Sequence, residues 1–134
     1  MVELILHHAS VITRDLERSA QFYEGVLGLN RITRPPFTIK GTWLGAGPSL
    51  QVHLTAYDGG YFRTGPVDAN DVHFAFRTTE FEPILARLQA AGYSDGLPVD
   101  DPLHMILRRT GAAGFAQLYV LDPDRNIIEI NGAA

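Results

Sequence analysis

LYVLDPDRNIIEIN, residues 118–131, is the stretch that decides the fold. Two apolar runs flank residues 122–126, where a proline fixes φ and Asp and Asn side chains can bond to their own backbone, so the sequence predicts a tight hairpin. Glu129 stands between Ile128 and Ile130, and the alternation of a strand places its carboxylate on the opposite face from them. A solvated outer face is the ordinary position of such a glutamate. The remainder of the chain favours a partnered one instead.

Composition limits the possible classes of protein. The chain has 134 residues, of which 46% are hydrophobic and 19% charged, enough for one compact domain or for two small modules sharing a sheet. No apolar run approaches the roughly 20 residues of a membrane span, and MVELILHHAS lacks a basic leader, so we expect a cytoplasmic protein. There is no cysteine, and a net charge of −4 disfavours nucleic-acid binding. A small-molecule partner remains.

The first half of the chain predicts one strand, one helix and three further strands. Residues 4–12 read as a strand in which the adjacent His7 and His8 point to opposite faces, with Ser10 on the face of His8. A helix then starts at an Asp15 cap and stops at Gly28. Strands are expected at residues 29–34, 38–44 and 50–57, followed by a polar loop over residues 58–71.

The second half repeats this order. Residues 72–77 predict a strand, and Thr79 with Glu82 predicts a capping box that opens a helix ended by Gly92. Strands at residues 97–99 and 103–109 then precede the closing hairpin. We therefore predict an α+β fold built from two βαβββ modules within a single domain, 1–134, with module one at about 1–58 and module two at about 72–134.

A constant offset supports the repeat. A shift of 65 residues takes His8 to His73 and Asp15 to the acidic Glu80 at the start of the second helix. The counterpart of Glu129 in the first half is Gln51 or His53. An offset of 76 for His53 requires an insertion in the second half, between its helix and its last hairpin.

A pseudo-twofold arrangement of such modules would gather His8, His73 and Glu129 on one concave surface, with Gln51 or His53 beside them. Two imidazoles and one carboxylate with open positions suit a divalent Fe, Mn, Ni, Co or Zn ion that also holds a substrate. Each residue taken alone has an ordinary structural explanation, such as a satisfied core or surface histidine. The shared offset favours the metal site.

Three stretches together resemble the vicinal oxygen chelate superfamily, and they occur in the family's order over nearly the whole chain. They are HHASVITRDLERSAQFYEGVLGLN, DVHFAF and LYVLDPDRNIIEIN. The superfamily includes glyoxalase I, methylmalonyl-CoA epimerase, extradiol dioxygenases, fosfomycin-modifying thiol transferases and metal-free bleomycin-binding proteins. The resemblance implies that the two modules curl into a half-barrel cup of mixed sheet with helices outside, completed in a homodimer.

The resemblance also implies a ligand set. His8, His73 and Glu129 match the family's metal ligands, and the fourth glyoxalase ligand, a glutamate, falls on or near His53, with Gln51 as the alternative. Neither is glutamate, which departs from the four-ligand glyoxalase site. Metal-free members lack these ligands, so their presence here argues against a purely sequestering bleomycin-resistance role.

The choice of reaction depends on residues outside the ligand set. Tyr119 stands ten residues before Glu129, as the acid-stabilising tyrosine of extradiol enzymes does, although a structural aromatic role is equally open. Arg125 replaces their usual Gly or Pro, and their second-shell histidine is missing. The loop TGAAGFA lacks the serine of the thiol transferases. Anionic substrate would have four candidate anchors, each with a solvated surface role as the alternative: Arg63, Arg77, Arg108 and Arg109.

The expected protein is a homodimeric metalloenzyme of the glyoxalase-like lyase or isomerase type, which chelates a small oxygen-rich substrate on a divalent metal and stabilises an oxyanion or enediolate. Glu129 and Tyr119 are its expected catalytic residues. Its substrate pocket is expected to include Ser10, Gln51, Trp43 as a wall and Phe62 as a lid or a loop anchor. An extradiol-type dioxygenase, a thiol transferase and a metal-free small-molecule binding protein are the alternatives.

Overall fold

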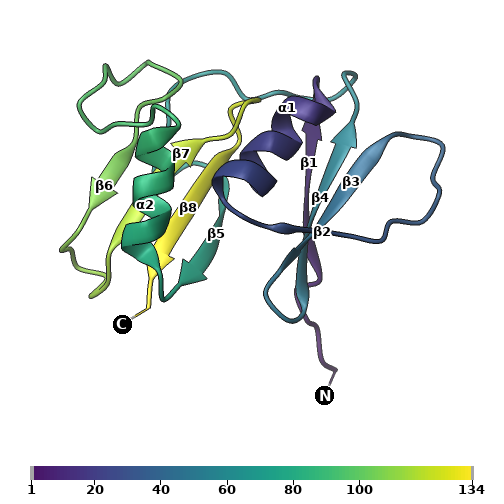
Figure 1. Cartoon of the computed structure of the whole chain (residues 1–134), viewed down its shortest axis with the longest axis horizontal. Coiled ribbons are helices and arrows are strands. Elements are labelled where there is room, and N and C mark those ends of the chain that lie inside the picture. Colours follow the sequence, from purple (N-terminus) through teal and green to yellow (C-terminus); the bar gives the residue numbers. More distant parts are fainter. Residues whose placement is uncertain (1, 134) are drawn as a thin grey trace. The chain divides into compact units, whose positions relative to one another are not determined.

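The computed structural model describes residues 2–133, which divide into two compact units between Gly60 and Tyr61. Each unit contains a four-stranded mixed sheet with helix packed on it (Figure 1). The order strand, helix, three strands occurs in both units. The α+β class and the repeated βαβββ order are therefore confirmed.

Unit 1 has the sheet order β1-β4-β3-β2, in which β1 and β4 are parallel and the other pairs antiparallel. After β1 the chain forms a helix whose second half is π-helical, and three strands follow. The elements are β1 (His8–Thr13), α1 (Leu16–Ala20), η1 (Gln21–Val26), β2 (Asn30–Ile32), β3 (Gly41–Ala46) and β4 (Leu50–Ala56).

Unit 2 repeats this topology with the order β5-β8-β7-β6, again with the first and last strands parallel. The predicted closing hairpin is confirmed, because β7 and β8 pair antiparallel across residues 122–126. The elements are β5 (His73–Thr78), α2 (Phe81–Ala90), β6 (Ile106–Arg108), β7 (Gln117–Leu121) and β8 (Ile127–Gly132).

Alternation along each last strand separates a helix-facing core from a second face. In unit 1 Leu44 and Leu54 are fully buried, and α1 contacts β3 and β4. In unit 2 Ile128 and Leu118 are fully buried, and α2 packs against β8. Residues one position away, Glu129 among them, point to the opposite face, which positions them for chemistry rather than for helix packing.

The helix ends were predicted with mixed success. Asp15 caps α1 by accepting from the Arg18 amide (3.1 Å), as expected. Gly28 and Gly92 have φ of 82° and 102°, the left-handed conformation that stops a helix. The capping box of Thr79 and Glu82 is wrong. The hydroxyl that caps this turn belongs to the preceding threonine and accepts from the Glu80 amide (2.8 Å), and Glu80 makes no side-chain cap bond.

Several predicted strands are shorter than expected, and one is absent. β1 starts at His8 instead of residue 4, because its pairing partner begins near Gln51. β2, β3 and β6 cover only parts of residues 29–34, 38–44 and 103–109, and β3 continues to Ala46. Residues 97–99 form no strand, because the chain bends at Leu97 and enters a turn at Val99, and the Leu97 carbonyl accepts from the His104 ring (2.8 Å).

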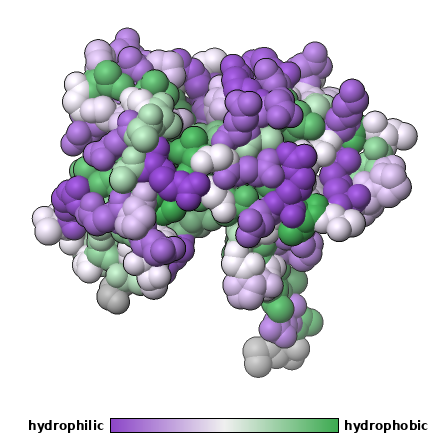
Figure 2. All heavy atoms as spheres, in the orientation of Figure 1, coloured by the Kyte–Doolittle hydropathy of each residue, from purple (hydrophilic) through white to green (hydrophobic). Residues whose placement is uncertain are grey.

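The segment before β1 exposes apolar side chains. Val2, Leu4, Ile5 and Leu6 are all more than two-thirds exposed, and Figure 2 shows apolar colour among the atoms of this extension. Within residues 2–133 no helix combines the length and apolar character that crossing a membrane requires.

Candidate functional site

The strand registers establish which residues of the two units are equivalent. His8 pairs with Gln51 and His73 with Ile127, so two positions further along each last strand stand His53 and Glu129. The register thus makes His53, not Gln51, the structural counterpart of Glu129. In the neighbouring strands Trp43 is opposite His53, as Tyr119 is opposite Glu129.

In unit 2 the predicted pair His73 and Glu129 lies in direct contact. The two residues belong to the parallel strands β5 and β8, and His73 Nε2 lies 3.2 Å from Glu129 Oε1. The histidine side chain is 27% exposed and the glutamate 9%, so the carboxylate is buried while the ring remains accessible. The solvated position that is ordinary for a strand glutamate does not apply here.

The other ring nitrogen of His73 is occupied. Nδ1 lies 2.7 Å from the carbonyl oxygen of Asp71, and a carbonyl can only accept, so Nδ1 carries a proton. A neutral ring then has a lone pair at Nε2, facing a carboxylate oxygen. Both contacts are satisfied together only when a cation is present, either as a second proton on the ring or as a metal ion between Nε2 and Oε1.

Polar side chains hold the second carboxylate oxygen. Glu129 Oε2 accepts from Asn131 Nδ2 (3.0 Å) and from Gln117 Nε2 (3.3 Å). Burial alone would raise the pKa of Glu129, but the hydrogen bonds of Asn131, Gln117 and Tyr119 and the nearby His73 outweigh it and lower the pKa. The carboxylate is therefore kept ionised and oriented.

Arg77 of β5 holds the Asn131 side chain in place. Arg77 Nε donates to Asn131 Oδ1 (2.7 Å), and its guanidinium lies 4.5 Å from the Phe115 ring centroid. Since the Asn131 oxygen is engaged by Arg77, its amide group is directed toward Glu129. Arg77 thus acts inside the network and not as a free anion anchor.

Tyr119 lies beside the pair. Its ring meets the His73 ring edge-on, with centroids 5.5 Å apart, and its hydroxyl accepts from Gln117 Nε2 (3.2 Å). Burial first, and then the Glu129 charge, raises the pKa of Tyr119, so the phenol keeps its proton at neutral pH. The guanidinium of Arg108 lies 5.7 Å from the Tyr119 ring centroid and is exposed.

Unit 1 presents a different chemistry at the equivalent positions. The His53 ring is stacked between His8 (centroids 4.0 Å, 17°) and Trp43 (4.0 Å, 2°). Burial first, and then the neighbouring His8, His7 and Arg34, lowers the pKa of His53 to about 4, so this ring is neutral under ordinary conditions.

Two contacts determine which nitrogens of this cluster are occupied. His53 Nε2 donates to Gln51 Oε1 (2.8 Å). The Nδ1 atoms of His7 and His8 lie 2.9 Å apart, so one of them donates a hydrogen bond and the other accepts it. Parallel rings 4.0 Å apart do not direct their in-plane lone pairs at one point, so His8 and His53 do not chelate a common ion in this arrangement.

The predicted site residues thus form two groups, one within each unit. His8, His53, Gln51 and Trp43 are together in unit 1, and His73, Glu129 and Tyr119 are together in unit 2. Ser10 is exposed in β1, opposite His53, and Phe62 is half-buried in the loop before β5. Within residues 2–133 no three His, Asp or Glu side chains are placed to hold a metal ion. The imidazole–carboxylate pair of unit 2 supplies two suitable donors.

The sequence predictions missed the groups that orient this pair. Asn131 lies two residues after Glu129 and so on the same face, and Gln117 is opposite Asn131 in the antiparallel register. That spacing was visible in the predicted hairpin. The role of the Asp71 carbonyl had no signal, because any residue type supplies one.

Comparison with known proteins yields a family and several relatives. A sequence profile of the Glyoxalase/Bleomycin resistance protein/Dioxygenase superfamily matches residues 5–130. The chain is 30% identical to glutathione transferase FosA of Serratia marcescens, over 94% of this chain and 79% of that protein. It is 27% identical to Glyoxylase I 4 of Arabidopsis thaliana, over 93% and 68%.

Solved structures agree on the fold. The crystal structure of the fosfomycin resistance protein FosX from Listeria monocytogenes superposes with a TM-score of 0.70 at 18% identity, covering 100% of this chain and 96% of that one. The profile match spans almost the whole chain, including both histidine-bearing first strands and the closing hairpin. The chain belongs to the Glyoxalase/Bleomycin resistance protein/Dioxygenase superfamily.

Proposed function

We propose that this protein is a metal-dependent enzyme of the glyoxalase-like lyase or isomerase type, in which His8, His73 and Glu129 hold a divalent ion and a small oxygen-rich substrate binds beside it. The observation that carries the proposal is the position of His73 between two acceptors, the Asp71 carbonyl and the Glu129 carboxylate. When bound there, a divalent ion polarises a substrate oxygen and favours negative charge on it.

The protein's own groups account for the other requirements. Asn131 and Gln117 fix the direction of the Glu129 carboxylate, and the lowered pKa of Glu129 keeps it anionic, so it is a better ligand than a proton carrier. Tyr119, with its raised pKa, retains a hydroxyl proton that it can donate to a substrate oxygen. Trp43, stacked on His53, offers an aromatic wall in unit 1.

His53 is the proposed fourth position, with Gln51 as the alternative. The strand register supports His53 as the counterpart of Glu129, whereas its hydrogen bond to Gln51 ties up Nε2 in the present arrangement. Either the His53 ring rotates away from Gln51 on metal binding, or water takes this position and Gln51 orients it.

A metal-binding comparison tests the ligand set. Purified protein is stripped with chelator and titrated with Co²⁺, Ni²⁺, Zn²⁺ and Mn²⁺ by calorimetry, and His8→Ala, His73→Ala and Glu129→Gln are titrated in parallel. We expect tight binding to the wild type and weaker binding to every variant. Unchanged affinity in His8→Ala would remove His8 from the ligand set, and absence of binding to the wild type would reject the metalloenzyme.

Glutathione transfer to a small electrophile is the second candidate function, because the FosA relative is a glutathione transferase. Exposed Arg108 beside Tyr119 supports an anionic substrate in this case. Consumption of glutathione with an epoxide favours the transferase, and isomerisation of a glutathione adduct without net thiol loss favours the first proposal. Oxygen uptake on catechols with the iron-loaded protein would instead support a ring-cleaving dioxygenase.

A homodimer in the cytoplasm remains our expectation for the assembly and location, and sedimentation of the purified protein tests the first of these.

A further inference from the structure

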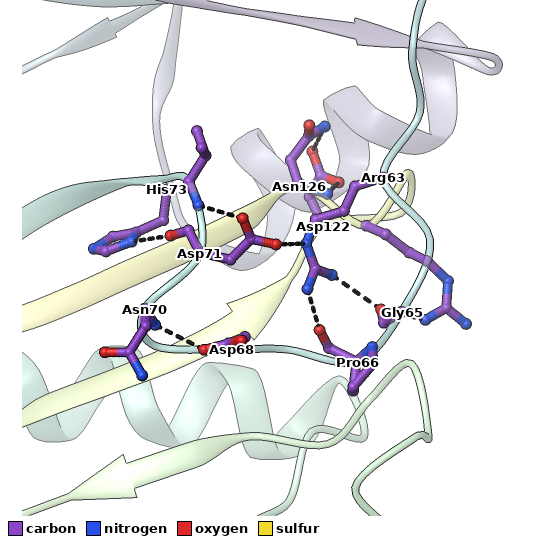
Figure 3. A network of polar contacts seen from close by, with 11 residues as sticks. Arg63, Gly65, Pro66, Asp68, Asn70, Asp71, His73, Asp122 and Asn126 are labelled. Atoms are coloured by element: carbon purple, nitrogen blue, oxygen red, sulfur yellow. Dashed lines mark hydrogen bonds and ion pairs between the residues drawn. The ribbon is translucent and has the colours of Figure 1, made fainter.

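The loop that precedes β5 is organised around one arginine. Residues 61–72 contain no helix or strand, yet Arg63 links three separate points of this segment (Figure 3). Its Nε donates to Asp71 Oδ2 (2.9 Å), one terminal nitrogen donates to the Gly65 carbonyl (2.9 Å), and the other donates to the Pro66 carbonyl. The Arg63 side chain is only 21% exposed.

These contacts leave Arg63 poorly suited to bind substrate. Three of its five N–H groups donate to groups of the same loop, which leaves an anion only one N–H on each terminal nitrogen and no forked pair that includes Nε. The carboxylate that Arg63 contacts belongs to Asp71, two residues before the start of β5. The contacts of Arg63 therefore indicate a structural function: it holds other groups of this loop in place.

The residue it holds is Asp71. One oxygen of the Asp71 carboxylate accepts from Arg63, and the other accepts from the Val72 amide (2.8 Å). The side chain is thus fixed at both oxygens, although it is 46% exposed. Because the rotation of the Asp71–Val72 segment is limited in this way, the direction of the Asp71 carbonyl is limited as well.

That carbonyl is the acceptor for His73 Nδ1 (2.7 Å), as Figure 3 shows. Its position matters because His73 has a competing arrangement. A neutral ring that carries its proton on Nε2 could donate to Glu129 Oε1, and Nε2 would then have no lone pair for a metal ion. A fixed acceptor at Nδ1 favours the opposite form, with the lone pair at Nε2.

We propose that Arg63 is a positioning residue for His73: through the Asp71 carboxylate it fixes the carbonyl that holds the imidazole, so that Nε2 is presented to the metal site. The inference rests on the proposed function, in which His73 is a ligand. Loss of comparable outer contacts of ligating histidines reduces metal affinity by roughly 10–100-fold. We expect about tenfold for Arg63→Ala, because the Val72 amide still holds one carboxylate oxygen.

The chain offers a matched control in Arg125. This residue also donates to the Gly65 carbonyl (2.9 Å) from the turn of the closing hairpin, but within residues 2–133 it makes no hydrogen bond or ion pair with Asp71. Arg125→Ala therefore removes one arginine and one hydrogen bond to the same loop, but it leaves the contacts from Arg63 through Asp71 to His73 unchanged. Arg63→Lys retains the charge but cannot make the forked contacts, and it covers the case in which Arg63→Ala does not fold.

Two measurements decide the inference. Crystal structures of the metal-free variants show whether His73 Nδ1 still lies within hydrogen-bond distance of the Asp71 carbonyl, and Co²⁺ titration gives the affinity. We expect both Arg63 variants to lose the ring position and to bind Co²⁺ more weakly, while Arg125→Ala resembles the wild type in both.

The inference is overturned if the His73 ring keeps its place in both Arg63 variants, or if Arg125→Ala displaces the ring equally. A wild type that binds no Co²⁺ would refute the proposed metalloenzyme. The ring position in the metal-free crystals would still decide whether Arg63 positions His73, so the two failures are distinguishable.

Discussion

Replacing Glu129 by glutamine should separate the fold from the metal site. The substitution keeps the shape of the side chain and exchanges one oxygen for an NH₂ group. If that NH₂ group takes the place of Oε1, it donates to the lone pair of a neutral His73 Nε2, now 3.2 Å from the carboxylate. The remaining oxygen still accepts from Asn131 and Gln117. Every polar group of the cluster then has a partner without any cation.

The energetic consequence follows from this count. A new neutral hydrogen bond contributes about 1 kcal/mol, and two bonds to a charged acceptor each weaken by a similar amount when the acceptor becomes neutral. Removal of a buried charge offsets part of that loss. We therefore expect Glu129→Gln to change the free energy of unfolding of the metal-free protein by no more than about 1 kcal/mol. Glu129→Leu leaves the Asn131 amide without its acceptor, while the Gln117 amide keeps the Tyr119 hydroxyl, and it should cost about 1–3 kcal/mol, the usual cost of one orphaned buried group.

Metal affinity, unlike the free energy of unfolding, should fall strongly in Glu129→Gln. Glutamine retains one neutral oxygen, which the two amides occupy, so the loss should exceed the roughly 10–100-fold that removal of an outer contact causes. The assay is urea unfolding in chelator at pH 8, followed by Co²⁺ titration of the folded variant. The reasoning is refuted if Glu129→Gln loses more than about 2 kcal/mol of stability, or if it binds Co²⁺ as the wild type does.

Three further predictions concern stability and are measurable by denaturant unfolding of the metal-free protein. Leu118→Ala empties a fully buried position on β7 and should lower the free energy of unfolding by about 2–5 kcal/mol. Tyr93→Phe removes the bond from the phenol to the Leu121 carbonyl (2.6 Å) and should cost about 1–3 kcal/mol, because a buried carbonyl loses a donor. The pKa of His53 is lowered from 6.5 to about 4 on folding, so its contribution is complete above pH 6.5 and is lost as the pH falls toward 4. Stability should therefore be about 2 kcal/mol lower at pH 5 than at pH 7, and His53→Gln should remove much of that dependence.

Much of the fold was accessible from the sequence because its signals are local. The Pro-containing turn of residues 122–126, the Asp15 cap and the glycine stops each act through a few neighbouring residues, and the structure contains them all. The errors in the helix cap and in the strand bounds arose where one sequence pattern fits more than one local structure. The capping-box pattern predicted a cap at Thr79, but Thr78 accepts from the Glu80 amide and the helix itself has no side-chain cap. Apolar alternation before His8 indicated a strand, but strand length depends on a partner that begins near residue 50.

For the candidate site, the sequence predicted that His73 and Glu129 lie on one surface as metal ligands, but it did not predict the groups that orient them. The counterpart of Glu129 in the first half stayed open between Gln51 and His53, because an insertion disturbs the spacing and only the strand register resolves it. Main-chain acceptors such as the Asp71 carbonyl leave no trace in residue types. They depend on loop geometry, which arises here from the contacts of Arg63.

The repeat has preserved its geometry while its two halves have diverged in chemistry. At equivalent positions, unit 2 places a buried carboxylate that amide donors keep ionised, whereas unit 1 places a neutral imidazole between two aromatic rings. In the proposed metal site, an acid at position 53 would bring a second negative charge to the divalent ion, so a histidine there would leave the ion more positive by one charge. A more positive ion withdraws electrons more strongly from a substrate oxygen. In the proposed metal site, a histidine at position 53 would therefore favour chemistry that depends on polarising the substrate over chemistry that needs a basic ligand.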